Sequence, residues 1–470
     1  MTEHDHLDEM LSDLRVLLQG AQRSGRKRPD AGTLCTDLRR TEMTRSGWLS
    51  GLALAIACAL ISTTGAAEET SPCATITRTN VTRCALGASL AAKSEQLTLR
   101  SFEGRRLAAG VFLPSNPTLS VTGGQSIVPT VRGGQRELLW SASLSQELEI
   151  GGQRGKRIDV VSAEQRVQSA HLQLARRVAA ADAWLLYFEA LAAAEESRLA
   201  ERLARLATAL TTVARARAQA GLGADVEAQL AEASASRLLQ AQLASQSRFA
   251  TASASLAAAV GLDPASANLR IEGELAPLSV VGAGGSAFVA SAIERRAEIA
   301  TATAEAHAQS NRVALYRRLR IPNPTLSVFV RKDWMNERQV GVGLDIPIPI
   351  PAPIGRTYAG EIAEASALAA RAGNEAERLR RMARLEIAQA LQVLKTRQRE
   401  AELFQPTQAR QTEETLRSIA EEIEARRLPI RDALLTQQAL IDYLFAYVDA
   451  RRQLCFASVE LARAAGLPLE

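Results

Sequence analysis

The side chains that most often carry out chemistry are scarce and widely separated in this 470-residue chain. Its four histidines are His4, His6, His171 and His307, and no two of them have the spacing of a metal site. No glycine-rich loop follows a strand to hold a phosphate, and residues 282–285 are interpreted as linker. No nucleophile motif is present either. We therefore expect no enzyme activity, no metal site and no cofactor.

The N-terminal region has the order of an export signal, starting at Met43. Residues 43–47 form a short basic start, residues 48–61 an apolar run and residues 63–67 a small-residue cleavage region, which together predict a signal peptide over residues 43–67. The apolar run, of 14 residues, is too short to span a membrane. Cys58 raises the alternative of a lipoprotein cleavage site, although the branched residue usual three positions earlier is missing.

The polar residues 1–42 precede this signal, which is an unusual place for a signal peptide. Two interpretations stay open: translation starts at Met43 and the leader is a gene-start error, or the leader is genuine. Export would leave Cys73, Cys84 and Cys455 in an oxidising compartment. Cys73 and Cys84 then either form a disulfide or stay free thiols. Cys455 is expected to be a small buried residue.

Composition favours long helices over a compact core. Only 4% of the residues are aromatic, and long alanine-rich stretches contain interspersed arginine and glutamate. The net charge of +5 is small and is spread over these stretches, which indicates solvated helix faces and argues against a nucleic-acid partner.

A duplication organises the chain. The peptide Asn-Pro-Thr-Leu-Ser-Val at residues 116–121 recurs unchanged at residues 323–328, and two later landmarks keep nearly the same offset. The sequence therefore predicts two tandem repeats, residues 86–262 and 291–467, separated by a Pro/Gly/Ser-rich connector over residues 263–290.

Each repeat is expected to contain a hairpin of strands with one apolar and one polar face. Apolar and polar residues alternate with the period of two that a strand requires. Four such strands are too few to close a barrel, but a trimer would supply twelve, with the apolar face toward lipid. The alternative is a small soluble sheet packed on a helix. The expected lipid-facing residues are Leu119, Val121, Trp140, Leu144, Leu326, Val328, Val342 and Leu344.

Each hairpin is followed by a very long helix, a break and a returning helix. One helix is expected from Gln153 to Ala220 and a second from Tyr358 to Arg427, each roughly 100 Å long at 1.5 Å per residue. Gly221 ends the first of these helices, and Asp225 is expected to cap the helix that returns. The fold class is thus mainly α with a small transmembrane β-barrel contribution.

These features resemble the outer membrane factors, the TolC-like channel proteins of Gram-negative efflux and secretion. The resemblance covers about residues 86–467 and includes the two Asn-Pro-Thr-Leu-Ser-Val peptides, Gly-Gly-Gln-Arg at residues 151–154 before the first long helix, and Leu-Ala-Arg-Ala-Ala-Gly at residues 461–466. The Asn-Pro-Thr-Leu-Ser form and the short strand loops look most like the branch that serves heavy-metal cation efflux.

The resemblance implies a homotrimer with a 12-stranded barrel in outer membrane lipid and a 12-helix tunnel across the periplasm. The tips of the helical hairpins would meet a periplasmic adaptor, which links them to an inner membrane transporter of the RND type. The residues expected to contact the adaptor are Gly221, Leu222, Gly223, Arg427, Leu428 and Pro429.

Asp432 matches the first of two acidic positions that line the periplasmic constriction in relatives, whereas Leu435 replaces the second. Two roles stay open for Asp432: a pore-lining charge, or a favourable charge at a helix N-terminus. The expected function is a passive duct for heavy-metal cations. The alternatives are a duct for drugs or secreted polypeptide, or a periplasmic coiled-coil scaffold without a pore.

Overall fold

The computed structural model describes residues 73–128, 135–265, 269–279, 285–333, 337–350, 353–425, 427 and 429–469. The predicted leader (1–42), the signal peptide (43–67), Cys58 and Leu428 lie outside the described residues.

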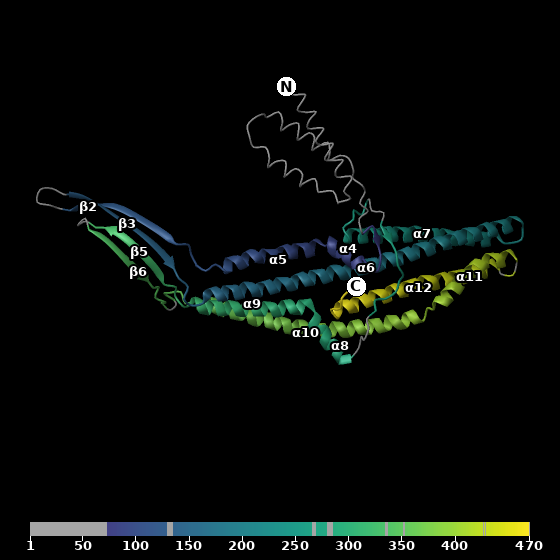
Figure 1. Ribbon diagram of the computed structural model, residues 1–470. Helices are drawn as coiled ribbons and strands as arrows, with labels where there is room; N and C mark the ends of the chain where they lie inside the picture. Colours follow the sequence, from purple (N-terminus) through teal and green to yellow (C-terminus); the bar gives the residue numbers. More distant parts are fainter. Residues whose placement is uncertain are drawn as a thin grey trace, which may run out of the picture. The chain divides into compact units, whose positions relative to one another are not determined.

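The strands form one antiparallel four-stranded sheet. Two hairpins, β2 (Thr118–Val128) with β3 (Gln135–Glu147) and β5 (Thr325–Lys332) with β6 (Arg338–Asp345), are joined through β3 and β5 (Figure 1). The strand order is β2-β3-β5-β6. Both predicted hairpins are confirmed, and β2 and β6 are the two edges of the sheet.

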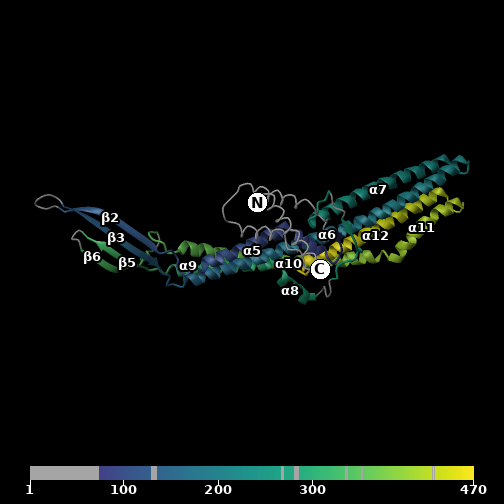
Figure 2. The same cartoon turned by 45° about the horizontal axis from the view of Figure 1, so that its top comes forward.

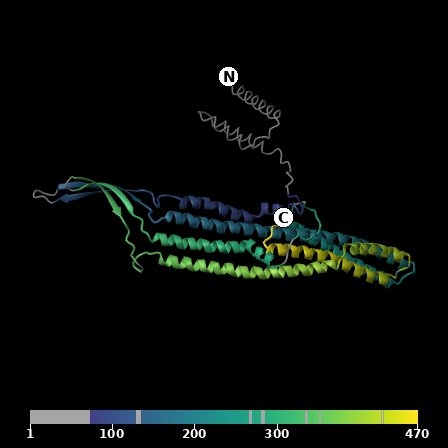
Figure 3. The same ribbon diagram turned by 60° about the horizontal axis from the view of Figure 1, so that its bottom comes forward.

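Four helices form a layer in the same order as the strands. In Figure 3, α5 (Leu90–Ala109), α6 (Gln153–Gln219), α9 (Ala297–Leu319) and α10 (Ala359–Glu402) lie side by side. The order follows from connectivity, because α5 leads into β2, β3 into α6, α9 into β5, and β6 into α10. The edge strands are therefore continued by the edge helices, α5 and α10.

The first long helix is confirmed. α6 has 67 residues, roughly 100 Å at 1.5 Å per residue, and returns as α7 (Asp225–Ala259). Figure 2 shows α7, α6, α12 (Ile430–Ala464) and α11 (Pro406–Glu424) running side by side.

The prediction of a continuous second helix from Tyr358 to Arg427 was wrong. α10 ends at Glu402 and α11 begins at Pro406. A proline lacks the backbone N–H that continues the helical ladder and fits best at the first helical position, so Pro406 imposes a new helix start. Phe404, in the break, packs against Tyr443 of α12 with ring centroids 5.3 Å apart.

Several short elements precede or separate the long helices in the sequence, and α4 (Val81–Ala88) and β4 (Arg270–Ile271) pack against α6. β1 (Thr75–Ile76) pairs in parallel with β4, which lies in the predicted connector, and α8 (Gly285–Arg295) precedes α9.

Cys73 forms a disulfide with Cys84 of α4, which settles the question that the sequence left open. Cys455 is buried, as predicted, and burial raises the pKa of its thiol to about 12.

The few large aromatic side chains gather where these short elements meet α6. Trp184, Tyr187 and Phe188 are fully buried, with ring centroids 5.4 to 5.7 Å apart. Trp184 Nε1 donates to Thr82 Oγ1 of α4 at 2.9 Å, and the Tyr187 hydroxyl donates to the Glu272 carbonyl at 2.8 Å. This cluster ties α4 and the β4 region to the long helix.

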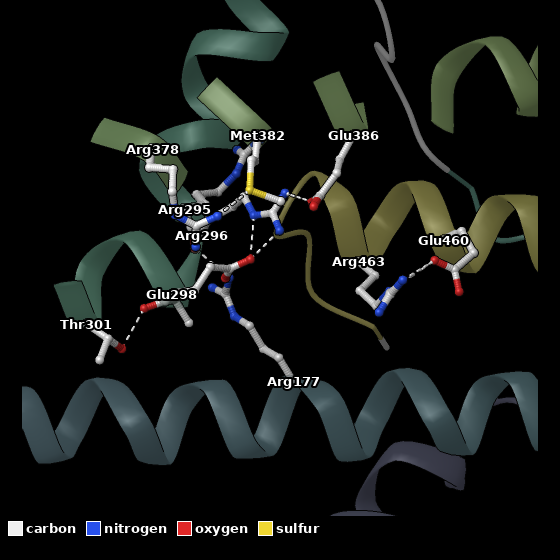
Figure 4. A network of polar contacts seen from close by, with 11 residues as sticks. Arg177, Arg295, Arg296, Glu298, Thr301, Arg378, Met382, Glu386, Glu460 and Arg463 are labelled. Carbon is white, nitrogen blue, oxygen red and sulfur yellow. Dashed lines mark hydrogen bonds and ion pairs between the residues drawn. The ribbon is translucent and has the colours of Figure 1, made fainter. Parts of the chain in front are cut away.

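A second tie joins α9 to α10. Arg296, 12% exposed at the junction of α8 and α9, forms ion pairs with Glu298 and with Glu386 of α10 (Figure 4). Arg177 of α6 donates to the Arg295 carbonyl at the same junction. Because Arg296 stays charged although it is largely buried, loss of either carboxylate would leave it poorly compensated.

Candidate functional site

The apolar face of the sheet is the first candidate functional surface. Cross-strand pairing aligns Leu119, Leu144, Val328 and Val342 in one row across all four strands. Their side chains are 50–70% exposed. All eight residues predicted to face lipid lie on this face, because each is in register with another or an even number of positions from another on the same strand. The sheet thus presents a continuous apolar surface that nothing in the described chain covers.

The opposite face is polar and hydrogen-bonded to itself. Ser120 and Thr122 of β2 lie beside Ser143 and Ser141 of β3, and the Thr122 and Ser141 hydroxyls are 2.7 Å apart. Arg331 donates to Gln339 Oε1 at 2.7 Å. Phe329 and Leu139 are apolar residues on this face, and the Phe329 ring lies over Gly341, where a Cβ would collide with it. The sheet therefore has one apolar and one mainly polar face.

The junction between sheet and helices explains the repeated Asn-Pro-Thr peptide. Asn323 Nδ2 donates to Glu147 Oε1 at 2.8 Å, and its Oδ1 accepts from Gln153 Nε2 at 2.9 Å. One side chain thereby links the end of β3, the start of α6 and the start of β5. Sequence reasoning recognised the peptide as a repeat but gave no role to Asn323, since both partners are more than 150 residues away.

The first tip has a well-defined turn. Gly221 adopts a φ of 69°, and the Leu222 N–H donates to the Arg217 carbonyl at 2.9 Å while the Gly221 N–H donates to the Ala218 carbonyl at 3.0 Å. This pair of bonds is the Schellman arrangement, which needs the left-handed residue that glycine provides. Leu222 is 52% exposed and Gly223 follows it in the turn.

Asp225 does not cap the returning helix as predicted. Ala224 holds the N-cap position without a side-chain bond, and Asp225 is the first residue of α7. The turn places the helix start one residue earlier than the pattern suggested. Asp225 and Glu227 still lie in the first turn, where the helix dipole favours negative charge.

The second tip has the same type of helix-ending backbone hydrogen bond as the first, between residues five positions apart. The Arg427 N–H donates to the Glu422 carbonyl at 2.9 Å, as Leu222 does to Arg217, and the Arg427 side chain pairs with Glu422 at 2.8 Å. Pro429 is the N-cap of α12. The missing glycine therefore does not prevent this helix-terminating bond. Contact with an adaptor stays a prediction for both tips.

Asp432 lies in the first turn of α12 and is exposed. Leu435, in the position of the missing acidic partner, is 64% exposed. This placement is compatible with both roles left open for Asp432, so its part in a constriction stays a prediction.

Charged residues pack where α6 meets α12 and α7. Arg451 lies 3.7 Å from Glu195, and Arg452 lies 3.2 Å from Glu189. Burial raises the pKa of Glu195 and of Glu196, while Arg451 and Arg248 respectively oppose the shift. Because the folded-state pKa of each is raised, protonation favours folding, and this contribution is lost as pH rises through the folded-state pKa.

The two histidines in the described part of the chain lie on different helices. His171 belongs to α6 and His307 to α9, and among the described residues no group of three or more histidine, cysteine or acidic side chains is placed to hold a metal ion. No helix in the described part of the chain is long and apolar enough to cross a membrane.

The fold is similar to that of solved bacterial outer membrane channels. The protein VceC of Vibrio cholerae aligns at 19% identity over 84% of this chain and 97% of its own, with a TM-score of 0.64. The CmeC channel of Campylobacter jejuni aligns at 14% identity over 83% and 85%, with a TM-score of 0.68. The MtrE channel of Neisseria gonorrhoeae, solved in its open state, aligns at 16% identity over 84% and 89%, with a TM-score of 0.61.

No family model matches the sequence, and no curated protein is similar to it at the sequence level. The likeness to the solved channels therefore shows a shared fold.

Proposed function

We propose that this chain is one subunit of a homotrimeric outer membrane channel, the outermost component of a tripartite export system in a Gram-negative bacterium. The observation that carries the proposal is the sheet, which has one exposed apolar face, one polar face and two free edges. In a bilayer such a sheet is stable only in a closed barrel, because backbone groups at an open edge would lack partners.

Three copies provide the simplest closure. Pairing β6 of one copy with β2 of the next would join four-stranded sheets into a twelve-stranded ring around a threefold axis. The polar face would then line the pore. The helical layer would close in the same way through α10 and α5, extending the duct into the periplasm.

The exposed tips and the likeness to outer membrane channels support a proposal for the partners. The two tips, at the ends of α6 and α11, would contact a periplasmic adaptor that connects them to an inner membrane transporter of the RND type. The channel itself would be passive, and energy would be supplied by the transporter. Selection of cargo would also occur mainly in the transporter.

Heavy-metal cations are the cargo implied by the resemblance to the heavy-metal efflux branch, which rests on the Asn-Pro-Thr-Leu-Ser form of the strand starts and the short strand loops. A duct for drugs or secreted polypeptide is the alternative. The transporter that copurifies with the channel, or that is encoded beside it, distinguishes these cargoes. A periplasmic scaffold without a pore is disfavoured by the uncovered apolar face of the sheet.

We expect the full chain to fractionate with the outer membrane, to require detergent for extraction and to run as a trimer in light scattering. Four strands with two open edges cannot satisfy their backbone groups in lipid as a monomer. Reconstitution into planar bilayers should give discrete conductance steps. A monomer that stays soluble without detergent and gives no conductance would refute the proposal and favour the scaffold.

Asp432→Asn should lower the preference of the channel for cations while leaving the trimer intact. Three carboxylates around a narrow pore attract cations and repel anions. The measurement is the reversal potential under a salt gradient. Asp225→Asn, in the first turn of α7 at the other tip, is the matched control. If both variants keep the wild-type reversal potential, Asp432 has only its helix-terminal role, worth about 0.3–1 kcal/mol.

A further inference from the structure

Two exposed apolar segments lie where the sheet meets the helices, at opposite edges of the layer. One is the α5 exit, residues 107–114, in which Leu107 is 78% exposed and Phe112 75% exposed. The other is the Ile-Pro segment, residues 346–350, in which Ile348 is 83% exposed and Ile350 49% exposed. Neither apolar surface is covered by another part of the described chain.

The two segments lie at the same level of the molecule. Thr118, Ser145, Ser327 and Gly343 form one row across the sheet. Phe112 precedes Thr118 by six residues, and Ile348 follows Gly343 by five. Figure 1 shows the starts of β2 and α10 at the same junction, with β2 and β6 on opposite edges.

The α5 exit is held in place by its own chain. At the α5 exit, Arg154 donates to the Gly110 carbonyl at 2.8 Å and Arg157 to the Val111 carbonyl at 3.3 Å. The exposed Leu107 and Phe112 side chains are therefore presented by an anchored backbone.

The residues just before α10, which follow the Ile-Pro segment in the sequence, are anchored to α9. Arg320 donates to the Thr357 carbonyl at 3.0 Å, and the ring of Tyr358 stacks on that of Tyr316 of α9 with centroids 6.3 Å apart. Tyr358 has a φ of 54°, an uncommon conformation for a residue other than glycine. The equivalent N-cap of α6 is Gly152, with a φ of 70°. A Cβ on Gly355 would collide with the Ile350 carbonyl, so Gly355 lies close against Ile350.

The duplication shows how such segments pack. Within the chain, the exit of β3 lies beside the entry of β5: the Leu148 N–H donates to the Pro324 carbonyl at 2.9 Å, and Gln153 donates to the Ile321 carbonyl at 3.1 Å. A Cβ on Gly151 would lie 3.0 Å from Ile321 Cβ, so the two segments are in close contact.

By the repeat, the exit of β6 corresponds to the exit of β3, and the entry of β2 corresponds to the entry of β5. They lie at opposite edges of one chain, so a second copy is needed to bring them together. Asn116, the repeat equivalent of the bridging Asn323, is exposed at this edge.

We propose that the Ile-Pro segment of one copy packs on the α5 exit of the next copy and forms an apolar collar between barrel and helical tunnel. Proline at positions 347 and 349 removes alternate backbone donors, so the segment cannot extend the strand ladder and contacts its partner through side chains. The occupant is a second copy of this chain, because the apolar surfaces are continuous with the open edges of both sheet and helices. The inference rests on the proposed trimer.

Cysteine crosslinking of the full-length protein in outer membranes tests the collar. The double variant Phe112→Cys/Ile348→Cys, oxidised with copper phenanthroline, should yield covalent dimers and trimers. A reductant should cleave these disulfides and return monomers on a denaturing gel. Each single variant should yield none. Leu97→Cys/Ile348→Cys is the matched control, because Leu97 lies on the same edge helix but roughly 20 Å from Phe112 at 1.5 Å per residue. The native Cys455 is buried.

Light scattering of the wild-type protein separates the inference from the proposed function. A trimer that shows no Phe112–Ile348 crosslink overturns the collar and leaves the channel standing. A monomer overturns both. A fluorophore on Ile348→Cys gives a further check: quenching by spin-labelled lipid as strong as that at Val342→Cys would place the segment against lipid and overturn the collar, whereas weak quenching supports it.

Discussion

Val328→Lys is expected to abolish stable insertion into the outer membrane. Val328 lies in the apolar row with Leu119, Leu144 and Val342, and its side chain is 50% exposed in the single chain. A lysine on the lipid face of a barrel costs about 2–4 kcal/mol at the bilayer midplane. A trimer would bear this cost three times, which is comparable to the total stability of many proteins. Membrane fractionation and the yield of detergent-extracted trimer measure the effect.

Ser327→Lys provides the matched control in the same strand. Its side chain lies on the opposite, polar face, across from Gly343, where no side chain competes for space. The proposed pore lining should accept the new charge, so trimer yield should stay near that of the wild type. Equal trimer yields from the two lysine variants would contradict the assignment of the faces.

Trp184→Ala is expected to cause the largest loss of folding stability in the helical part. Trp184 is fully buried against Tyr187 and Phe188, and its indole N–H bonds to Thr82 of α4. Removal of a buried tryptophan side chain typically costs about 3–5 kcal/mol, because a cavity remains among side chains that relax only partly. The midpoint of thermal unfolding, followed by circular dichroism of the detergent-purified protein, should fall by several degrees.

Trp184→Phe retains most of the ring volume and loses only the bond to Thr82. Its unfolding midpoint should therefore lie between those of the wild type and Trp184→Ala. Because the cluster is far along α6 from the sheet, both variants should still form the barrel. An unchanged midpoint in Trp184→Ala would show that this cluster does not hold α4 and the β4 region to α6.

The sequence alone predicted the features that depend on local signals. Alternation of polarity identified both hairpins, and the absence of proline from residues 153–220 identified the length of α6. Gly221 marked the first tip, because a left-handed residue is needed there and glycine adopts that conformation readily. Pro406 was an equally local signal for the break between α10 and α11, but the prediction of one long second helix overlooked it.

Tertiary structure decided what depends on contacts between distant residues. The pairing of β3 with β5 set the strand order and hence the free edges. Asn323 was recognisable as part of a repeat, yet only the fold brought Glu147 and Gln153 to it. The same holds for Arg296 and Glu386, which are 90 residues apart.

The physical reason is the range of the interactions. Helix length, turn chemistry and the polarity of a strand's faces depend on residues within a few positions of one another, so a single sequence records them. Register, edge exposure and the packing of the Ile-Pro segment depend on which distant segments become neighbours. For this chain the local pattern determined the elements, and the tertiary structure decided which of their surfaces remain open to a second copy.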